Sequence, residues 1–247
     1  MAGSSQAFIV SPSTSQVIAL PGSFTNLEGS AVLPDDQWGY LADQGFSEAA
    51  ALDAVNLASH AVYQITSLPG FSPALSAVAA CPNGNTVVAT DSGDNQLDIF
   101  SGVSTDPTNP SESSAPVGSD PVAVACYQGL AYVADEGSST LEVVDLATAS
   151  VTTTISVGSS PDAVAVGSGK IYVANRGSNN ISIIRVGSTT VKSDAVVGTS
   201  PDGIAISYDA YVTNYGSNSV SVLSPGGSLL QTIASVPSPE AISLVKQ

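Results

Sequence analysis

Acidic and amide side chains recur at fixed places along the chain, and they are the groups best able to do chemistry. One set ends short apolar runs and comprises Asp43, Asp91, Asp135, Asn175 and Asn214. A second set begins apolar runs and comprises Glu28, Asp162, Asp202 and Glu240. Carboxylates brought together can work as general acid and base when burial separates their pKa values, and they can bind cations.

Most of these residues also have an ordinary structural use. Asp and Asn before Gly, and Asp after Ser-Pro, accept hydrogen bonds from nearby backbone N–H groups and so stabilise turns. Departures from the repeat are therefore more informative than the repeat itself, and Arg176 and Tyr215 each follow an amide of the first set. We predict a binding surface formed by Asp43, Asp91, Asp135, Asn175, Arg176, Asn214 and Tyr215. Our catalytic candidates are the second set.

The elements that position these residues are repeated short strands. Three successive segments read VGSDPVAVACYQGLAYVADEGSSTLEVVDL, VGSSPDAVAVGSGKIYVANRGSNNISIIRV and VGTSPDGIAISYDAYVTNYGSNSVSVLSP. Each contains a Pro turn, an alternating apolar run, a short turn, a second run, a Gly-Ser-Asn loop and a third run. Alternation with period two indicates strands, and a fourth strand follows each segment. No sustained 3.6-residue period is present, so we expect negligible helix.

Equivalent positions extend this repeat over the whole chain. Tyr211 is matched backwards by Tyr172, Tyr132, Val87, Tyr40 and Phe8. Six copies follow, of roughly 40 residues each, with a Pro- and Ser-rich insertion at residues 101–118. The first copy is short, and the last residues, SPEAISLVKQ, resemble a first strand. The prediction is one all-β domain, residues 1–247: a six-bladed β-propeller of four-stranded antiparallel blades, closed by pairing of the C-terminal strand with the N-terminal blade.

The runs YVTN at 211–214, YVAN at 172–175 and YVAD at 132–135 resemble the YVTN-type β-propeller repeat. VLPDDQWGYLAD at 32–43 is similar to it more loosely. Relatives of this family include archaeal surface-layer proteins, large subunits of quinoprotein amine dehydrogenases and lactonase-like propellers, many of them seven-bladed. The resemblance implies the fold, whereas one architecture serves many functions.

The charge of the chain restricts its partners. It has 21 acidic and 5 basic residues, and every basic residue lies at or after Lys170. A net charge of −16 repels phosphate backbones, so we expect no nucleic-acid partner; it favours a cation or a basic protein. No stretch reaches the ~20 apolar residues of a membrane span, so we expect no membrane insertion. The N-terminus has no basic region followed by a long apolar one, so we expect any export signal to have been removed already.

The sequence offers little for metals, cofactors or a nucleophile. Asp91, Asp94 and Asp98 form a cluster of oxygen ligands without the full calcium-loop pattern, so we expect a solvated turn and no metal. One His and two Cys make zinc improbable, and no cofactor motif is present. His60 is predicted in a turn away from the acidic residues. Cys81 and Cys126 are expected as free thiols, although an oxidising compartment would favour a bridge.

Three functional hypotheses follow. The first is an exported acidic scaffold that binds a small-molecule ligand or a basic protein through the loops at one face. The second is an enzyme without cofactor, of hydrolase, lyase or cyclase type, that uses carboxylates of that face. The third is a structural component of a cell-surface layer. We expect a monomer in an extracellular, periplasmic or cell-surface setting. Whether the protein is an enzyme stays open at this point.

Overall fold

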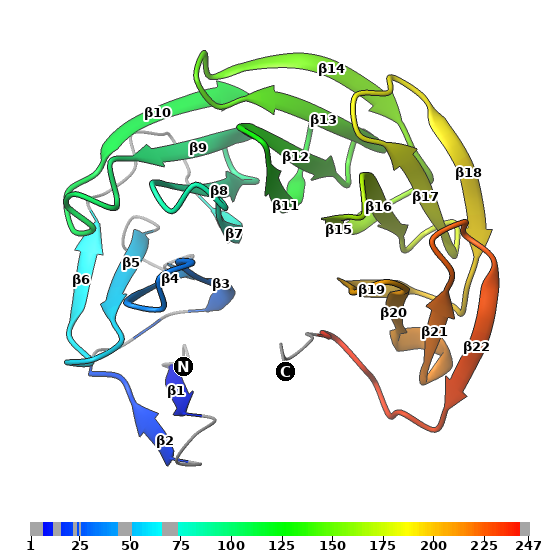
Figure 1. Ribbon diagram of the computed structural model, residues 1–247, viewed down its shortest axis with the longest axis horizontal. Helices are drawn as coiled ribbons and strands as arrows, with labels where there is room; N and C mark the ends of the chain where they lie inside the picture. The colour runs from blue at the N-terminus through cyan, green and yellow to red at the C-terminus, as the bar shows by residue number, and fades with distance from the viewer. Residues whose placement is uncertain are drawn as a thin grey trace. The chain divides into compact units, whose positions relative to one another are not determined.

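The chain is described by a computed structural model that covers residues 7–11, 16–21, 24, 26–43, 51–65 and 74–242. It divides into two compact units, Met1–Ala115 and Pro116–Gln247, which are described separately. Both are built from antiparallel strands joined in sequence order (Figure 1).

The first unit contains a two-stranded sheet and two four-stranded sheets. Its strands are β1 (Phe8–Ser11), β2 (Gln16–Ala19), β3 (Leu27–Val32), β4 (Trp38–Asp43), β5 (Ala51–Asn56), β6 (Val62–Ile65), β7 (Leu75–Ala80), β8 (Thr86–Asp91), β9 (Gln96–Ser101) and β10 (Ser111–Pro116), the last of which ends at the boundary between the units.

The second unit contains three four-stranded sheets. Its strands are β11 (Pro121–Tyr127), β12 (Leu130–Asp135), β13 (Thr140–Asp145), β14 (Ser150–Ser156), β15 (Pro161–Gly167), β16 (Lys170–Asn175), β17 (Asn180–Arg185), β18 (Val191–Val196), β19 (Pro201–Ile206), β20 (Ala210–Asn214), β21 (Ser219–Leu223) and β22 (Leu229–Ala234). The first strands β11, β15 and β19 contact one another in succession.

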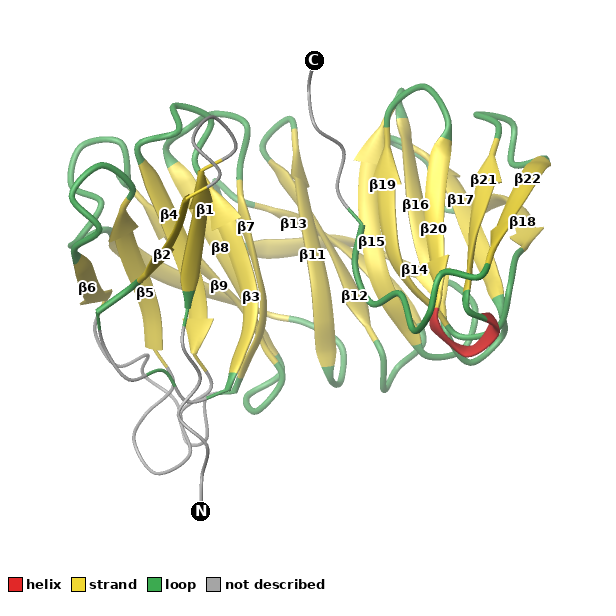
Figure 2. Cartoon of the chain, turned by 90° about the horizontal axis from the view of Figure 1, so that it is seen from below, coloured by secondary structure: helices red, strands yellow, loops and turns green. Residues whose placement is uncertain are grey.

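Helical structure is almost absent from the described residues. A single 3-10 turn, Tyr215–Ser217, joins β20 to β21 (Figure 2). None of the described residues form a helix long and apolar enough to cross a membrane. The expectation of negligible helix is confirmed for this part of the chain.

The core of each unit lies between neighbouring sheets. Tyr40, Tyr132 and Tyr172 are fully buried at equivalent positions on second strands, three residues before the Asp or Asn that ends each strand. In the second unit Tyr132 packs with Ile171 and Val173 of the next sheet. Within each unit the hydrophobic effect thus joins neighbouring sheets, because alternate residues of the middle strands face the neighbouring sheet.

Five four-stranded sheets and one two-stranded sheet are present among the described residues. The predicted four-strand repeat is therefore confirmed for five copies, whereas six blades and a closed ring are not observed. The last residues, 243–247, and much of the first copy lie outside the described residues. One residue of the predicted repeat is corrected. The buried tyrosines lie three residues before the Asp or Asn that ends their strand, and in β8 that position is Val88 rather than Val87. The difference arises because the β7–β8 turn is longer than its counterparts.

The chain continues past β22 along the first strand β19. A Cβ added to Gly203 of β19 would lie 3.4 Å from the Cα of Ala241. The same contact exists in the first unit, where a Cβ on Gly29 of β3 would lie 3.1 Å from the Cα of Ala77 in β7. Residues 240–241 thus lie against β19 as the next first strand, β7, lies against β3.

Both cysteines are disulfide-bonded, so the expectation of free thiols was wrong. Cys81 follows β7, and Cys126 lies in β11. The expectation assumed a separation greater than the ~7 Å between Cα atoms that a disulfide tolerates.

Candidate functional site

The residue that ends each second strand organises the turn after it. Asp91 Oδ1 accepts hydrogen bonds from the backbone N–H groups of Ala74, Gly93 and Asp94, at 2.8, 3.0 and 3.2 Å. The carboxylate thus ties the β8–β9 turn to the residue just before β7. This is the turn function that Asp and Asn serve by bonding nearby backbone N–H groups.

The other members of the first set are equally enclosed. Asp135, Asn175 and Asn214 have no exposed surface, and Asp43 is 9% exposed. Asn175 donates from Nδ2 to Ser182 Oγ at 3.0 Å, and Asn214 does the same to Ser221 Oγ. The structure places these side chains inside the sheets and brings only their neighbours, such as Arg176 and Tyr215, to the surface.

Two loops meet beside each buried residue in the second unit. The loop that precedes a first strand accepts backbone hydrogen bonds from the loop between the second and third strands: Arg176 N–H donates to Ser160 at 2.8 Å, and Tyr215 N–H to Ser200 at 3.0 Å. A Cβ on Gly158 would lie 2.6 Å from Asn175 Cγ, so only glycine fits there. The two loops form one fixed platform.

Each described first strand contains a β-bulge near its start, which leaves one residue without a partner in the strand pairing. The pairing shifts between Leu27 and Gly29, Leu75 and Ala77, Pro121 and Ala123, Pro161 and Ala163, and Pro201 and Gly203. The skipped residues are Glu28, Ser76, Val122, Asp162 and Asp202. Three of our four catalytic candidates, Glu28, Asp162 and Asp202, therefore occupy equivalent bulge positions in three different first strands. Bulges re-aim side chains and occur next to functional sites.

Arg176 is the centre of a charged cluster in the second unit. Its Nη1 lies 3.8 Å from Asp162 Oδ2, and the two side chains are 49% and 21% exposed. The charges of Glu136 and Asp202 also act on the pKa of Asp162, and those of Arg176 and Glu240 act on the pKa of Asp202. We call Glu136, Asp162, Arg176, Asp202 and Glu240 the Arg176 cluster. The cluster has four acidic groups and one guanidinium, and therefore an excess of acidic groups.

Two members of the cluster, Asp162 and Asp202, hold their protons more tightly than isolated carboxyls do. Burial raises the pKa of Asp162 to about 6, with Arg176 lowering it and Glu136 and Asp202 raising it. The pKa of Asp202 is also raised, chiefly by burial, while a 2.7 Å hydrogen bond from Thr213 Oγ1 lowers it. Asp162 can therefore gain or lose a proton just below neutral pH.

The remaining predicted residues fall into two places. Glu240 is exposed in the segment beside β19, and Tyr215, 40% exposed, starts the 3-10 turn in the loop equivalent to that of Arg176. Glu28, at the bulge of β3, belongs to the first unit and is described there alone. In the structure Asp162 and Asp202 interact with Arg176, and Glu240 interacts with Asp202. The structure adds Glu136, which the sequence showed only as a further loop acid.

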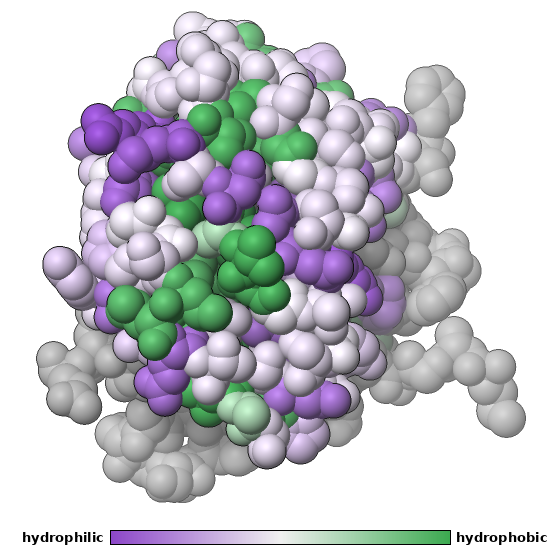
Figure 3. All heavy atoms as spheres, turned by 90° about the vertical axis from the view of Figure 1, so that its right-hand side faces the viewer, coloured by the Kyte–Doolittle hydropathy of each residue, from purple (hydrophilic) through white to green (hydrophobic). Residues whose placement is uncertain are grey.

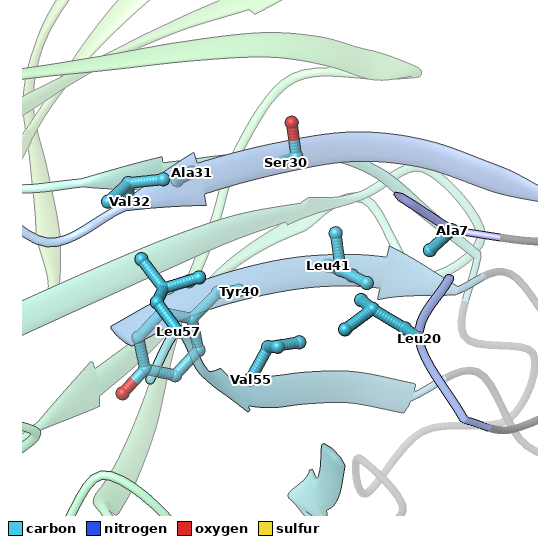
Figure 4. A pocket seen from close by; sticks show the side chains of 10 residues that line it. Ala7, Leu20, Ser30, Ala31, Val32, Tyr40, Leu41, Val55 and Leu57 are labelled. Atoms are coloured by element: carbon cyan, nitrogen blue, oxygen red, sulfur yellow. The ribbon is translucent and has the colours of Figure 1, made fainter. Parts of the chain in front are cut away.

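The first unit has a pocket of different character. It has a volume of about 290 Å³ and lies between the β1–β2 sheet and the sheet of β3–β6. Leu20 faces Leu41 and Val55 across it, and Ser30 supplies a hydroxyl (Figure 4). The described residues that line this pocket are uncharged, so they offer packing surface rather than acid–base chemistry.

Asp91, Asp94 and Asp98 do not form the solvated turn we expected. Asp91 has no exposed surface and Asp98 only 4%, because both point into the sheet of β7–β10. Among the described residues, no group of three or more acidic, His or Cys side chains is placed to hold a metal ion. His60 lies in the β5–β6 turn, as predicted.

Comparisons with known proteins bear on the fold. The chain resembles solved structures at 13% identity: a protein of unknown function from Desulfotomaculum acetoxidans (TM-score 0.72, 92% of this chain and 77% of that one), a chain of a nidogen/laminin complex (0.65, 98% and 95%) and a streptogramin B lyase (0.74, 88% and 72%). The last two are β-propellers.

The fold is a β-propeller.

No protein-family profile matches the chain, and no curated protein matches it. The neighbours of this propeller include a protein from a binding complex and an enzyme, so the likeness indicates architecture and leaves function to the residues of the site. We refer to its four-stranded sheets as blades from here on.

Proposed function

We propose that this propeller is a binding scaffold whose Arg176 cluster takes a cationic small molecule or a basic protein segment. The observation that carries the proposal is the gathering of four carboxyls with a single arginine: Arg176 interacts with Asp162 and Asp202, which in turn interact with Glu136 and Glu240. An excess of carboxylates on a rigid platform attracts an ammonium or guanidinium group, and the partly exposed positions leave it accessible.

The repeat itself supports this reading. The buried members of the first set maintain the turns, whereas the bulge residue and the residue after the amide vary from blade to blade. At the first of these positions the blades carry Glu28, Ser76, Val122, Asp162 and Asp202. At the second, the described blades carry Ser92, Glu136, Arg176 and Tyr215. A recognition surface requires side chains that differ from blade to blade on a loop backbone that stays the same.

Calorimetric titration with an amidated tetralysine peptide at low ionic strength tests the proposal. The double variant Asp162→Asn/Asp202→Asn should weaken binding by about tenfold or more, and added salt should weaken binding to the unaltered protein. Asp36→Asn/Asp145→Asn removes the same charge from two turns away from the cluster and should bind as the unaltered protein does. Equal weakening in both double variants would show attraction by net charge alone and overturn the site.

A second candidate function is acid–base catalysis at the same residues. It is favoured by the pKa of about 6 at Asp162 beside a cationic partner, together with the likeness to a lyase. A panel of chromogenic lactones and esters tests it. Turnover that follows a pKa near 6 and is lost in Asp162→Asn would establish the enzyme; no turnover by the unaltered protein would leave binding as the function.

We also propose that residues 240–247 supply the first strand of the blade that begins with β1 and β2, which makes six blades and closes the ring. The support is the packing of Ala241 on Gly203, which repeats the packing of Ala77 on Gly29. Closure would remove the free edge that a first strand would otherwise present.

An exported protein fits the bonded cysteines, because disulfides persist in oxidising compartments. We propose an extracellular, periplasmic or cell-surface location and a monomeric state. Secretion assays with the full gene product and size-exclusion chromatography with light scattering test these two points.

A further inference from the structure

A diagonal pair of polar side chains crosses the second and third strands of every described blade. In the blade of β15–β18, Asn175 lies opposite Asn180 and Ser182 lies opposite Val173, so Asn175 and Ser182 are diagonal neighbours on one face. Asn214 and Ser221 hold the same places in the last blade. In both, the amide Nδ2 donates to the serine Oγ at 3.0 Å. Side chains at this diagonal are therefore within hydrogen-bonding distance.

In the other three blades both members of the diagonal pair are acidic. The pairs are Asp43 with Asp53, Asp91 with Asp98, and Asp135 with Glu142. Asp53 is 7% exposed, Asp98 4%, and Asp91 and Asp135 have no exposed surface. Two carboxylates at this separation and burial repel each other strongly unless one of them carries a proton.

Unpartnered oxygens show where a proton is needed. Asp91 Oδ2, Asp98 Oδ2 and Asp135 Oδ1 are buried and accept no hydrogen bond. A buried acceptor without a donor is costly, and a carboxylic O–H between the two groups supplies the missing donor. In the two blades that lack the second acid, Asn175 Oδ1 and Asn214 Oδ1 are also buried without a partner, but the Nδ2 of each amide supplies a donor across the pair.

The charged groups that shift the pKa values of Asp53, Asp98 and Asp135 are all acidic. Asp98 faces Asp91, Asp94 and Glu112, with a 3.0 Å hydrogen bond from Gln96 Nε2 to its other oxygen. Asp53 faces Asp43. Asp135 faces Glu142 and accepts a 3.1 Å hydrogen bond from Thr140 Oγ1.

We propose that each of these three blades keeps one proton on the buried Asp53, Asp98 or Asp135 of its carboxyl pair, so that the propeller is most stable in acidic surroundings and loosens when these protons leave. The two blades with the Asn–Ser pair carry the same link in a form that does not titrate. At this diagonal position the chain thus has three pairs that depend on a proton and two that do not.

The direction of the pH effect follows from burial. Burial, with repulsion from the partner acid, raises the pKa of Asp53 to about 6, and that of Asp98 and of Asp135 to about 7. The pKa of each is about 3.9 when unfolded, so between pH 4 and 7 the folded state holds more protons than the unfolded state. The stability from these pairs is complete below pH 4 and is lost as pH rises through 6 to 7.

Thermal unfolding between pH 4.5 and pH 8 tests the inference, with two variants that copy the non-titrating blades. Asp135→Asn copies Asn175, and Asp98→Ser copies Ser182. Combined, they should raise Tm at pH 8 by about 3 °C or more and flatten its fall with pH. The control Asp36→Asn removes an exposed carboxylate at φ 56°, which Asn tolerates, and should keep the slope of the unaltered protein.

A measurement on the unaltered protein covers the case in which the variants misfold. Unfolding at pH 6 should release protons to the buffer, detected as a dependence of the calorimetric enthalpy on the ionisation enthalpy of the buffer. A Tm that does not fall from pH 5 to pH 8, or proton uptake on unfolding at pH 6, would overturn the inference. So would a calcium-dependent rise of Tm at pH 8 that Asp98→Ser abolishes, because the pair would then bind a cation instead of a proton.

Discussion

Arg176 occupies a position at which the other described blades carry Ser92, Glu136 and Tyr215. Its backbone does the same work as theirs, since the N–H donates to the preceding loop. Its side chain alone distinguishes the blade, and it is the cation that lowers the pKa of both Asp162 and Asp202. The chemistry of the Arg176 cluster therefore depends on one side chain.

Replacing that side chain gives a first prediction. In Arg176→Met the pKa of Asp162 should rise further above 6, because the attraction that favours the carboxylate is lost while burial and the acidic neighbours remain. Carboxyl-carbon NMR titration measures it. Arg185→Met, which removes an exposed arginine at the end of β17, should leave the titration unaltered. An unchanged Asp162 titration in Arg176→Met would mean that the 3.8 Å ion pair has no effect in solution.

At the residue scale, the sequence was a better guide to which acidic residues lie near one another than to which side chains are buried. The spacing of Asp162, Asp202 and Glu240 was enough to place them together, since each begins a first strand. The same reasoning took Asp91, Asp135, Asn175 and Asn214 for surface groups, although each lies inside its blade. Their turn function was recognised, but the sequence does not show that a turn-forming carboxylate points inward. The partner acids Asp53 and Glu142 were missed, and Asp98 was interpreted as part of a solvated turn. The signal was an acid at the third position of a third strand, between apolar neighbours.

The paired loops are the element that gives the site its rigidity. In VGSDP, VGSSP and VGTSP the glycine faces the buried Asp or Asn, and the following Ser or Thr N–H donates to a serine of the neighbouring loop, at 3.2 Å for Ser119 and 3.1 Å for Ser159 and Thr199. These four-residue loops are thereby fixed at both ends.

Gly158→Ala tests this arrangement. The added Cβ would lie 2.6 Å from Asn175 Cγ and would contact Ser178 Oγ, so we expect a loss of about 1–3 kcal/mol in the free energy of unfolding. Denaturant titration measures it. Gly226→Ala is the control: its nearest contact would be 3.6 Å, and its φ is not in the left-handed region, so it should change stability little. Equal effects of the two substitutions would contradict the packing of the loops.

Strands were the most predictable elements. The period-two pattern predicted four strands for each of five copies, and the structure confirms them. The bulges were not predicted, because a bulge depends on which backbone groups pair and leaves no residue signature at Val122, Ser76 or Asp162.

The outermost strand β22 is exposed along its whole length and carries no charge, unlike β18 with Lys192 and Asp194. Figure 3 shows apolar side chains gathered over this side of the second unit.

At the scale of the whole molecule, the disulfide is a restraint that the sequence left open. The bonded cysteines are 45 positions apart, so the bond restricts the unfolded chain by about 4 kcal/mol in the loop-entropy treatment.

Cys81→Ser/Cys126→Ser should lower the free energy of unfolding by about that amount. Guanidinium titration compares this variant with the unaltered protein, and reductant should bring the unaltered protein to the stability of the variant. The variant itself should not respond to reductant. Equal stability of both proteins without reductant would show that the bond does not restrict the unfolded state.

Ring closure gives another prediction at this scale. Deleting residues 238–247 should lower Tm by several degrees and expose β1 and β2 to proteolysis, since the proposed partner strand is gone. Glu240→Gln changes the charge of the same segment without shortening it and should keep both Tm and protease resistance. A truncated protein as resistant as the full chain would reject closure by this segment. The repeat predicted the partner strand from SPEAISLVKQ, but a sequence alone cannot show that the ends of a chain meet.

The bulge at the start of each first strand has a consequence for how such a protein can change over time. The buried Asp or Asn and the glycine of each blade maintain the backbone, whereas the skipped residue belongs to no ladder pair and varies freely, from serine to valine to aspartate. New specificities can therefore arise by single substitutions that leave folding untouched. A library randomised at Ser76, Val122, Asp162 and Asp202 should yield mostly folded proteins with different binding preferences, which makes this chain a natural starting scaffold for selecting binders.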